Sequence, residues 1–267
     1  MRGKIRLAAG IAAALLFSAQ ASATIVRVQT ALGSFDVNLY DRNTPATVAN
    51  FLGYVNSGAY ANMFMHRSVG GFVLQGGGYR YTGPGAFESI PANAAVTNEP
   101  KYSNVRGTIA MAKVSGNANS ATNQWFINTG NNSANLDVQN GGFTAFGQVV
   151  GNGMTVVDAI NALQVFAVNS ALDSLPLRDY TTQNLNSGVT ITDQHLIITS
   201  VTVIDSSPDT AASLSPPPNT LINQPPTNPG GGSDTDSGGG ATGLGSLLLL
   251  GLLALLRQRR SFSAAFR

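Results

Sequence analysis

The chain has 267 residues, of which only 10% are charged and 43% are hydrophobic. Disorder along the whole chain is excluded, because disordered chains combine few hydrophobic residues with many charges. The sequence has no cysteine, which excludes disulfide scaffolds and thiolate metal sites. Its two histidines, His66 and His195, are too few for a histidine-rich zinc site.

The basic residues are concentrated at the two ends of the chain. Seven of the 15 Lys and Arg residues lie within residues 1–6 and 257–267. Residues 24–205 hold eight basic and ten acidic residues, so this central part has a net charge of −2. A slightly acidic body does not attract phosphates, although the pI of the whole chain is about 9.0. We therefore expect no nucleic-acid partner.

Residues 1–23 have the pattern of a secretory signal peptide. A basic start precedes an apolar run over residues 7–17, and Ala21-Ser22-Ala23 supplies the small residues of a cleavage site. An ordinary membrane helix is the alternative, but the run is short for a span and its ending favours cleavage. The pattern predicts export and a mature chain that begins at Thr24.

Residues 24–205 are the predicted folded domain, and 182 residues can bury a core without disulfide or metal support. The first elements are two strands, 24–30 and 34–40, which form an antiparallel hairpin. In the second strand hydrophobic and polar residues alternate. Thr44 and Pro45 then mark the start of a helix whose apolar residues share one face, and Gly58 marks its end.

Short strands recur along the rest of the domain. They are predicted over residues 64–69, 72–75, 107–112, 124–128, 144–150 and 196–205. A second helix is predicted over residues 154–163, with Val156, Ile160 and Leu163 along one side. Many short strands and two helices predict a mainly β architecture, a β-barrel.

The C-terminal part of the chain divides into two segments. Residues 206–240 are rich in Ser, Pro, Gly, Asn and Thr, which is typical of a disordered linker. Residues 241–256 are mostly apolar, and three arginines, Arg257, Arg259 and Arg260, follow them. Sixteen helical residues extend about 24 Å, which is short for a bilayer core of about 30 Å. The basic end predicts a cytoplasmic C-terminus and an exported body.

This tail resembles the bacterial C-terminal sorting signals of the GlyGly-CTERM kind. The resemblance depends on Ser237-Gly238-Gly239-Gly240, the Leu-rich segment and the terminal arginines. It implies that a membrane protease removes the tail and that the body is transferred to the cell surface, so that membrane attachment is transient. A permanent single-span anchor is the alternative. Residues 238–243 also fit the GxGxxG pattern, but no βαβ unit surrounds them, so that match is chance.

Two stretches of the domain stand out because they combine polar and aromatic residues within predicted strands. The first is residues 66–77, His-Arg-Ser-Val-Gly-Gly-Phe-Val-Leu-Gln-Gly-Gly. The second comprises residues 107–112, Gly-Thr-Ile-Ala-Met-Ala, and residues 123–127, Asn-Gln-Trp-Phe-Ile. Leu136-Asp137 and Phe146-Gly147 follow in order. In this ordered set the sequence resembles the cyclophilins, a family of peptidyl-prolyl cis-trans isomerases, over essentially all of residues 24–205.

The resemblance implies a fold and a set of site residues. The fold is a closed, eight-stranded antiparallel barrel capped by two α-helices. The catalytic arginine is Arg67. The substrate-binding residues are Phe72, Val73, Gln75, Ala112, Lys113, Gln124, Phe126, Leu136 and Phe143. Within this set Phe72, Val73, Phe126, Leu136 and Phe143 correspond to the proline pocket, and Ala112 and Lys113 offer backbone groups to an extended peptide. His66 is assigned a structural role, because nothing in the pattern supplies it with a triad.

Several positions depart from the family pattern. Met65 and Trp125 each replace one large apolar residue with another, and Val73 stands where methionine is common. Asn135 occupies a position that is often aromatic and that, by the resemblance, contributes to the surface for the drug cyclosporin, so we expect cyclosporin to bind weakly. Phe143 stands where other members have His or Tyr.

The chemistry of prolyl isomerisation suits these residues. Rotation about an X-Pro bond breaks no covalent bond, so it needs a pocket, peptide anchors and a hydrogen-bond donor, with no metal and no cofactor. The sequence therefore predicts an isomerase that acts on proline-containing peptides and unfolded exported proteins. We expect a monomer in the periplasm or at the bacterial cell surface, either released or tethered. The alternatives are a non-catalytic peptide-binding or chaperone module and a purely structural barrel.

Overall fold

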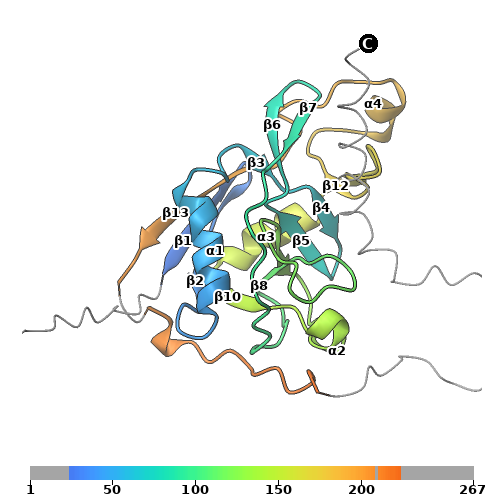
Figure 1. Ribbon diagram of the computed structural model, residues 1–267. Helices are drawn as coiled ribbons and strands as arrows, with labels where there is room; N and C mark the ends of the chain where they lie inside the picture. The colour runs from blue at the N-terminus through green and yellow to red at the C-terminus, as the bar shows by residue number, and fades with distance from the viewer. Residues whose placement is uncertain (1–23, 208–209, 224–267) are drawn as a thin grey trace, which may run out of the picture.

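The computed structural model describes residues 24–207 and 210–223. The predicted signal peptide and the predicted apolar tail lie outside these residues. The main feature of the described residues is one sheet of eleven strands in which every neighbouring pair is antiparallel (Figure 1). The order is β4 (Arg67–Val69), β5 (Val73–Gly76), β9 (Trp125–Asn128), β8 (Thr108–Met111), β10 (Ala145–Val150), β2 (Gly33–Leu39), β1 (Ile25–Thr30), β13 (Ile198–Asp205), β3 (Met63–Phe64), β6 (Tyr79–Gly83) and β7 (Ala86–Ser89).

The strand order does not confirm one detail of the sequence prediction. Pairing gives an open sheet that ends at β4 and β7, whereas the sequence predicted a closed ring of eight strands. The predicted strand 64–69 is divided into β3 and β4, with Met65 and His66 between them. The Met65 N–H donates to Ile197 O at 3.2 Å, and the His66 N–H donates to Gln75 O at 3.0 Å. The mainly β antiparallel fold is confirmed.

The two predicted helices are present as α1 (Pro45–Asn56) and α3 (Gly153–Asn161). The start of α1 is as predicted, but the Thr44 side chain does not cap it, since Thr44 Oγ1 donates to Tyr40 O at 3.2 Å. Glu99 caps it instead, through Oε2, which accepts from the Thr47 N–H at 2.9 Å. Further short elements complete the described chain: α2 (Ser133–Leu136), α4 (Thr182–Asn186), the 3-10 turns η1 (Gln139–Gly141) and η2 (Thr210–Ser213), and a hairpin of β11 (Val165–Phe166) and β12 (Leu175–Pro176).

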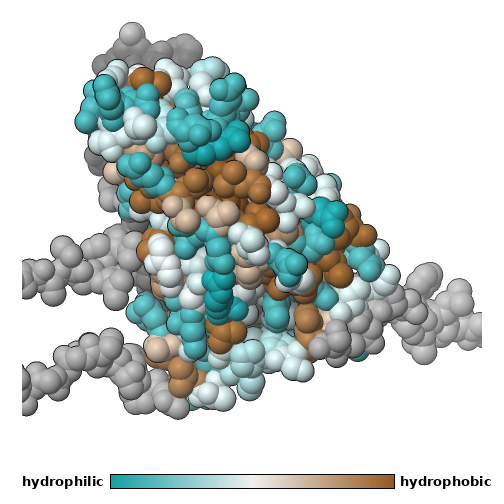
Figure 2. All heavy atoms as spheres, turned by 180° about the vertical axis from the view of Figure 1, so that it is seen from behind, coloured by the Kyte–Doolittle hydropathy of each residue, from teal (hydrophilic) through white to brown (hydrophobic). Residues whose placement is uncertain are grey.

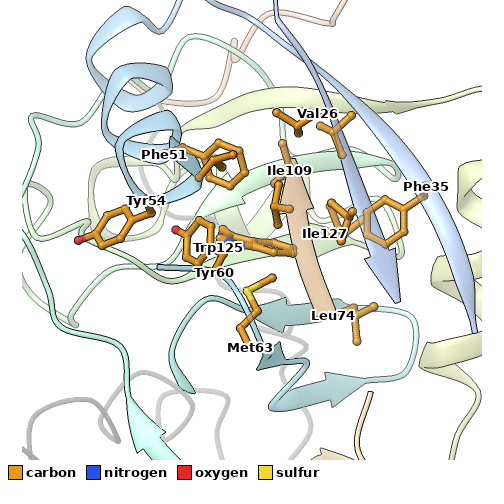
Figure 3. Close-up of a cluster of buried hydrophobic side chains, with 14 of the residues drawn as sticks. Val26, Phe35, Phe51, Tyr54, Tyr60, Met63, Leu74, Ile109, Trp125 and Ile127 are labelled. Atoms are coloured by element: carbon orange, nitrogen blue, oxygen red, sulfur yellow. The ribbon is translucent and has the colours of Figure 1, made fainter. Parts of the chain in front are cut away.

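The main hydrophobic core lies between α1 and the sheet. Figure 3 shows Phe51 and Tyr54 projecting from α1 toward Tyr60 and Trp125. The Phe51 ring meets the Trp125 ring edge-on, with 6.3 Å between their centroids, and stays 0% exposed. Burial of such large rings contributes about 1.5–3 kcal/mol each. Because Trp125 lies on β9, this packing fixes the strand that also carries Phe126.

A second hydrophobic cluster builds an upper lobe beside this core. It joins Phe64 to residues from the segment that follows α3: Phe166, Leu172, Leu175, Leu177, Tyr180, Ile191 and Leu196. In Figure 1 the β6–β7 hairpin, β12 and α4 lie together at the top of the molecule. The opposite face shows a hydrophobic area below this lobe, bordered by hydrophilic atoms (Figure 2).

Residues 210–223 return to the body of the domain, and we refer to them as the strap. Asn38 Nδ2 donates to Thr210 O at 2.9 Å, and the Ser103 N–H donates to Pro217 O at 2.9 Å. Asn219 closes the contact, because its Nδ2 donates to Asp137 O at 3.0 Å. The strap lies within the predicted linker 206–240, which was expected to be disordered. Within residues 24–207 and 210–223, no helix has the length and hydrophobicity needed to cross a bilayer.

Candidate active site

A cavity of about 180 Å³ opens over four neighbouring strands, β4, β5, β9 and β8. Its lining contains every residue that the sequence assigned to catalysis or substrate binding: Arg67, Phe72, Val73, Gln75, Ala112, Lys113, Gln124, Phe126, Leu136 and Phe143. These residues come from segments up to 76 positions apart, since Arg67 and Phe143 bound the set. The fold therefore brings the predicted site residues together.

The floor of the cavity is apolar and separate from the main core. Val73, Phe126, Leu136 and Phe143 are each at most 5% exposed and form a cluster with Ala110. The Phe126 and Phe143 rings meet edge-on, with centroids 5.9 Å apart. Edge-to-face rings at this spacing attract each other. The floor is thus a preformed hydrophobic surface whose shape its own side chains maintain.

One wall of the cavity is a chain of polar side chains on adjacent strands. Arg67 on β4 is registered with Gln75 on β5, and Arg67 Nη1 donates to Gln75 Oε1 at 3.2 Å. Gln75 Nε2 in turn donates to Gln124 Oε1 at 2.8 Å. The second terminal nitrogen of the guanidinium, Arg67 Nη2, is buried and has no hydrogen-bond partner within the described residues. An unsatisfied donor thus lies in the wall, above the apolar floor.

Burial also governs the charge on this wall. Burial lowers the pKa of the Arg67 guanidinium below its usual value of 12.5, and the nearby carboxylate of Asp173 opposes this shift. An arginine side chain remains protonated at neutral pH in proteins. The site therefore holds a fixed positive charge in a partly dehydrated setting, where a hydrogen bond from it is stronger than in water.

His66 forms the base of the same wall. Its ring is 4% exposed and meets the Tyr79 ring edge-on, with 5.1 Å between their centroids. Burial, followed by the charge of Arg67, lowers the pKa of His66 to about 3, so the ring is neutral at neutral pH. A group with this pKa is poorly matched to proton transfer near pH 7. The structural role predicted for His66 agrees with this setting.

The opposite wall is formed by Ala112 and Lys113. The Lys113 side chain does not extend into solvent, because Nζ donates to Asn140 O at 2.8 Å and to Gly142 O at 2.5 Å, and lies 4.7 Å from the centre of the Phe143 ring. Burial lowers the pKa of Lys113 to about 8. Lys113 therefore supports the loop that carries Phe143. The Ala112 N–H already donates to Gln124 O at 2.9 Å, so its carbonyl is the group left for a peptide.

Glycine is required behind the polar wall. Gly77 has φ +82°, a conformation that costs other residues strain. A Cβ at this position would overlap the carbonyl oxygen of Asn123 and lie 2.9 Å from Cδ1 of Trp125. The glycine lets β5 and the start of β9 approach closely, which sets the distance between Gln75 and Gln124.

The cavity also contains residues that the sequence prediction missed. Tyr79, Val114, Ser120, Thr122, Gln139, Ala171 and Asp173 line it in addition to the predicted set. Asn135, which the sequence placed at the cyclosporin surface, also lines it. Ala171 and Asp173 lie on the β11–β12 hairpin, about 100 residues after Arg67 in the chain. No periodicity or motif links this hairpin to the site. Within the described residues, no group of three or more His, Asp or Glu side chains is arranged to hold a metal ion.

Comparison with known proteins places these observations in a family. The family model described as "Cyclophilin type peptidyl-prolyl cis-trans isomerase/CLD" matches residues 25–183. A "Peptidyl-prolyl cis-trans isomerase" of Acinetobacter baylyi is 38% identical over 148 residues, which cover 55% of this chain and 77% of that protein. "Peptidyl-prolyl cis-trans isomerase A" of Dickeya dadantii is 39% identical over 150 residues, which cover 55% of this chain and 75% of that one.

A solved structure is similar as well. The crystal structure of a cyclophilin type isomerase from Cryptosporidium parvum covers 68% of this chain and 98% of its own, with 22% sequence identity and a TM-score of 0.47. The strap begins after the last residue of the family match.

Proposed function

Because this chain belongs to the cyclophilin-type peptidyl-prolyl cis-trans isomerases, we propose that Arg67 promotes rotation of X-Pro bonds held over Phe126 and its neighbours. The observation that carries this proposal is the position of the buried, unpartnered Nη2 of Arg67 in the wall of the apolar cavity. The cavity takes the proline ring, and Arg67 supplies the donor.

Catalysis of this rotation requires no covalent bond to break. Rotation about the prolyl bond passes a barrier of about 18–20 kcal/mol, because twisting removes the resonance that keeps the amide planar. As resonance is lost, the prolyl nitrogen regains a lone pair. A guanidinium that donates to this nitrogen forms a bond that is stronger in the twisted state than in the ground state, which is the condition for catalysis.

Arg67→Ala tests this role. Removing one preorganised donor of this kind typically lowers turnover about 10²–10³-fold. Arg67→Lys restores little, because an ammonium lacks the planar fork of donors. Phe126→Ala instead opens the floor and weakens peptide binding. Isomerisation rate and thermal stability are measured side by side. An Arg67→Ala protein that is folded and turns over at the wild-type rate contradicts the mechanism.

We also infer that the sheet closes into the eight-stranded barrel that the resemblance implies. Residues 63–69 form backbone hydrogen bonds to β13 at their N-terminal end and to β5 at their C-terminal end. Counted as a single bent strand, this stretch would join the two sides of the sheet, with β6 and β7 as an added hairpin. A set of interstrand amide contacts in solution that joins Met65 to Ile197 and His66 to Gln75 would support closure.

The proposed role is the folding of exported proteins in the periplasm or at the cell surface, and the signal pattern of residues 1–23 supports export. One contact supports a mature start at Thr24. The Thr24 backbone nitrogen lies 2.9 Å from Asp41 Oδ2, and Thr24 Oγ1 donates to Asp41 Oδ1 at 2.9 Å. Burial raises the pKa of Asp41, so the hydrogen bonds from Thr24 do not fully compensate for the burial of this carboxylate. Cleavage before Thr24 would place a new ammonium group beside it.

Intact-mass analysis of the native protein tests the processing. The expected species begins at Thr24 and ends near Gly238–Gly240, as a cleaved sorting signal requires. A species that begins at Thr24 but keeps residues 241–267 would support the permanent anchor instead. A species that keeps residues 1–23 would contradict export by signal cleavage.

A further inference from the structure

The β11–β12 hairpin places an acidic side chain at the Arg67 end of the cavity. Three bonds shape its tip, since Asn169 Oδ1 accepts from the Ala171 and Leu172 N–H groups at 2.9 and 3.0 Å, and the Val168 N–H donates to Leu172 O at 2.9 Å. Leu172 and Leu175 are 2% and 0% exposed in the upper lobe. The residues between these two anchors are therefore fixed in position.

This hairpin is also joined directly to the strand that carries Arg67. β12 lies beside β4 (Figure 1), and the Ser68 N–H donates to Ser174 O at 2.9 Å. Ser68 and Ser174 directly follow Arg67 and Asp173 in the chain. This backbone bond holds Asp173 next to Arg67 at the cavity wall.

The carboxylate of Asp173 has no fixed partner. Asp173 is half-buried, and within the described residues no hydrogen bond or ion pair involves its side chain. It is also the one acidic residue among the described residues that line the cavity. Its charge acts on the Arg67 guanidinium, but the carboxylate oxygens make no hydrogen bond within the described part of the chain, so at the cavity wall they are available to a charged group of the substrate.

The two ends of the groove differ in charge. From β4 to β8 the groove crosses three strand spacings, or about 14 Å. At the β8 end Lys113 is the charged residue, and its ammonium is already bonded to two carbonyls. At the β4 end Asp173 offsets the charge of Arg67. A peptide lying across the groove therefore meets a carboxylate of the described chain only on the Arg67 side.

Resting on the isomerase function proposed above, we propose that Asp173 selects substrates by charge. It favours peptides with a basic residue, and disfavours those with an acidic residue, next to the proline on the Arg67 side of the groove. A negative charge at a fixed, half-buried position always shifts preference toward cations relative to the same groove without it, whatever else binds the peptide.

The test compares matched peptides that differ at one residue. The peptides carry Lys, Ala or Glu either at the residue before the proline or at the residue after it. Isomerisation is measured by NMR exchange, because a protease-coupled assay would add the charge preference of the protease. The measured quantity is the ratio of kcat/KM for the Lys peptide to that for the Glu peptide. Asp173→Asn is expected to lower this ratio about three- to tenfold for one of the two positions. Asp173→Lys is expected to lower it further.

Asp179→Asn is the matched control. Asp179 is exposed, lies outside the cavity and has φ +51°, a conformation that asparagine also adopts readily. The Asp179→Asn substitution makes the same change of charge six residues away from Asp173. The ratio of kcat/KM for the Lys peptide to that for the Glu peptide should stay at the wild-type value. An Asp173→Asn protein with an unchanged ratio, or one that slows all three peptides equally, overturns charge selection. Wild-type protein that fails to isomerise the Ala peptide contradicts the isomerase function itself.

Discussion

Gln75 links Arg67 to the rest of the polar wall, and its truncation offers a sharp test of how the site works. Gln75→Ala removes the acceptor for Arg67 Nη1, a bond of 3.2 Å that is longer than the usual 2.9–3.0 Å. Hydrogen bonds to charged groups contribute about 1.5–3 kcal/mol, and the long distance favours the lower end. A loss of about 1.5 kcal/mol lowers kcat/KM about tenfold.

A double-mutant cycle separates two roles for Gln75. If Gln75 acts by holding Arg67, then Gln75→Ala should change the rate less than about twofold once Arg67 is alanine. If it binds the peptide directly, the tenfold loss should persist in both backgrounds, and the positioning argument is then refuted. Gln148→Ala is the control, because Gln148 is also half-buried and accepts a 3.2 Å bond from Tyr40 OH outside the cavity.

Two further predictions concern stability. His66 is neutral when folded, with a pKa of about 3 against 6.5 when unfolded, so only the unfolded state takes up its proton as the pH falls between these values. Stability should therefore fall by about 1.4 kcal/mol per pH unit below pH 6, and denaturant titrations of His66→Gln, which lacks this proton uptake, should show a shallower fall. For the strap, Asn219→Ala removes the bond to Asp137 O and should lower Tm by about 2–4 °C, whereas Thr220→Ala, an exposed neighbour, should not. Parallel pH curves, or equal Tm values for the two strap variants, would contradict these arguments.

The sequence anticipated elements whose signal is local. The Thr44-Pro45 start and the apolar stripe of α1 are properties of consecutive residues, and the helix begins where they indicate. The residue that caps the helix, Glu99, could not be predicted in this way, because it comes from a loop about 50 positions later in the chain. Position in the chain gives no sign of such a contact. The residues of the cavity could be predicted because they lie within an ordered set of family motifs.

The parts that were missed depend on long-range packing. Strands of two residues, such as β11 and β12, have too few side chains to show a period of two. Their hairpin is held by burial of Leu172 and Leu175 in the upper lobe, and it delivers Asp173 to the cavity. The motifs that identify the other site residues all lie within residues 66–147, and Asp173 lies beyond them. Substrate preference is thus encoded in the part of the sequence with the weakest pattern.

The strap shows that a segment with the composition of a linker can pack against a domain. Its Pro216-Pro217-Pro218 run suggested a linker, yet proline carbonyls are good acceptors, and those of Pro217 and Pro218 bond to the N–H and the hydroxyl of Ser103. Because proline restricts the unfolded chain, ordering this segment costs less entropy than ordering a glycine-rich one. The strap ends beside the loop between Leu136 and Phe143, since a Cβ on Gly142 would lie 2.9 Å from Ile222 Cδ1. Ile222 therefore lies against the loop that carries Phe143 of the cavity floor, so an ordered strap also supports that side of the cavity.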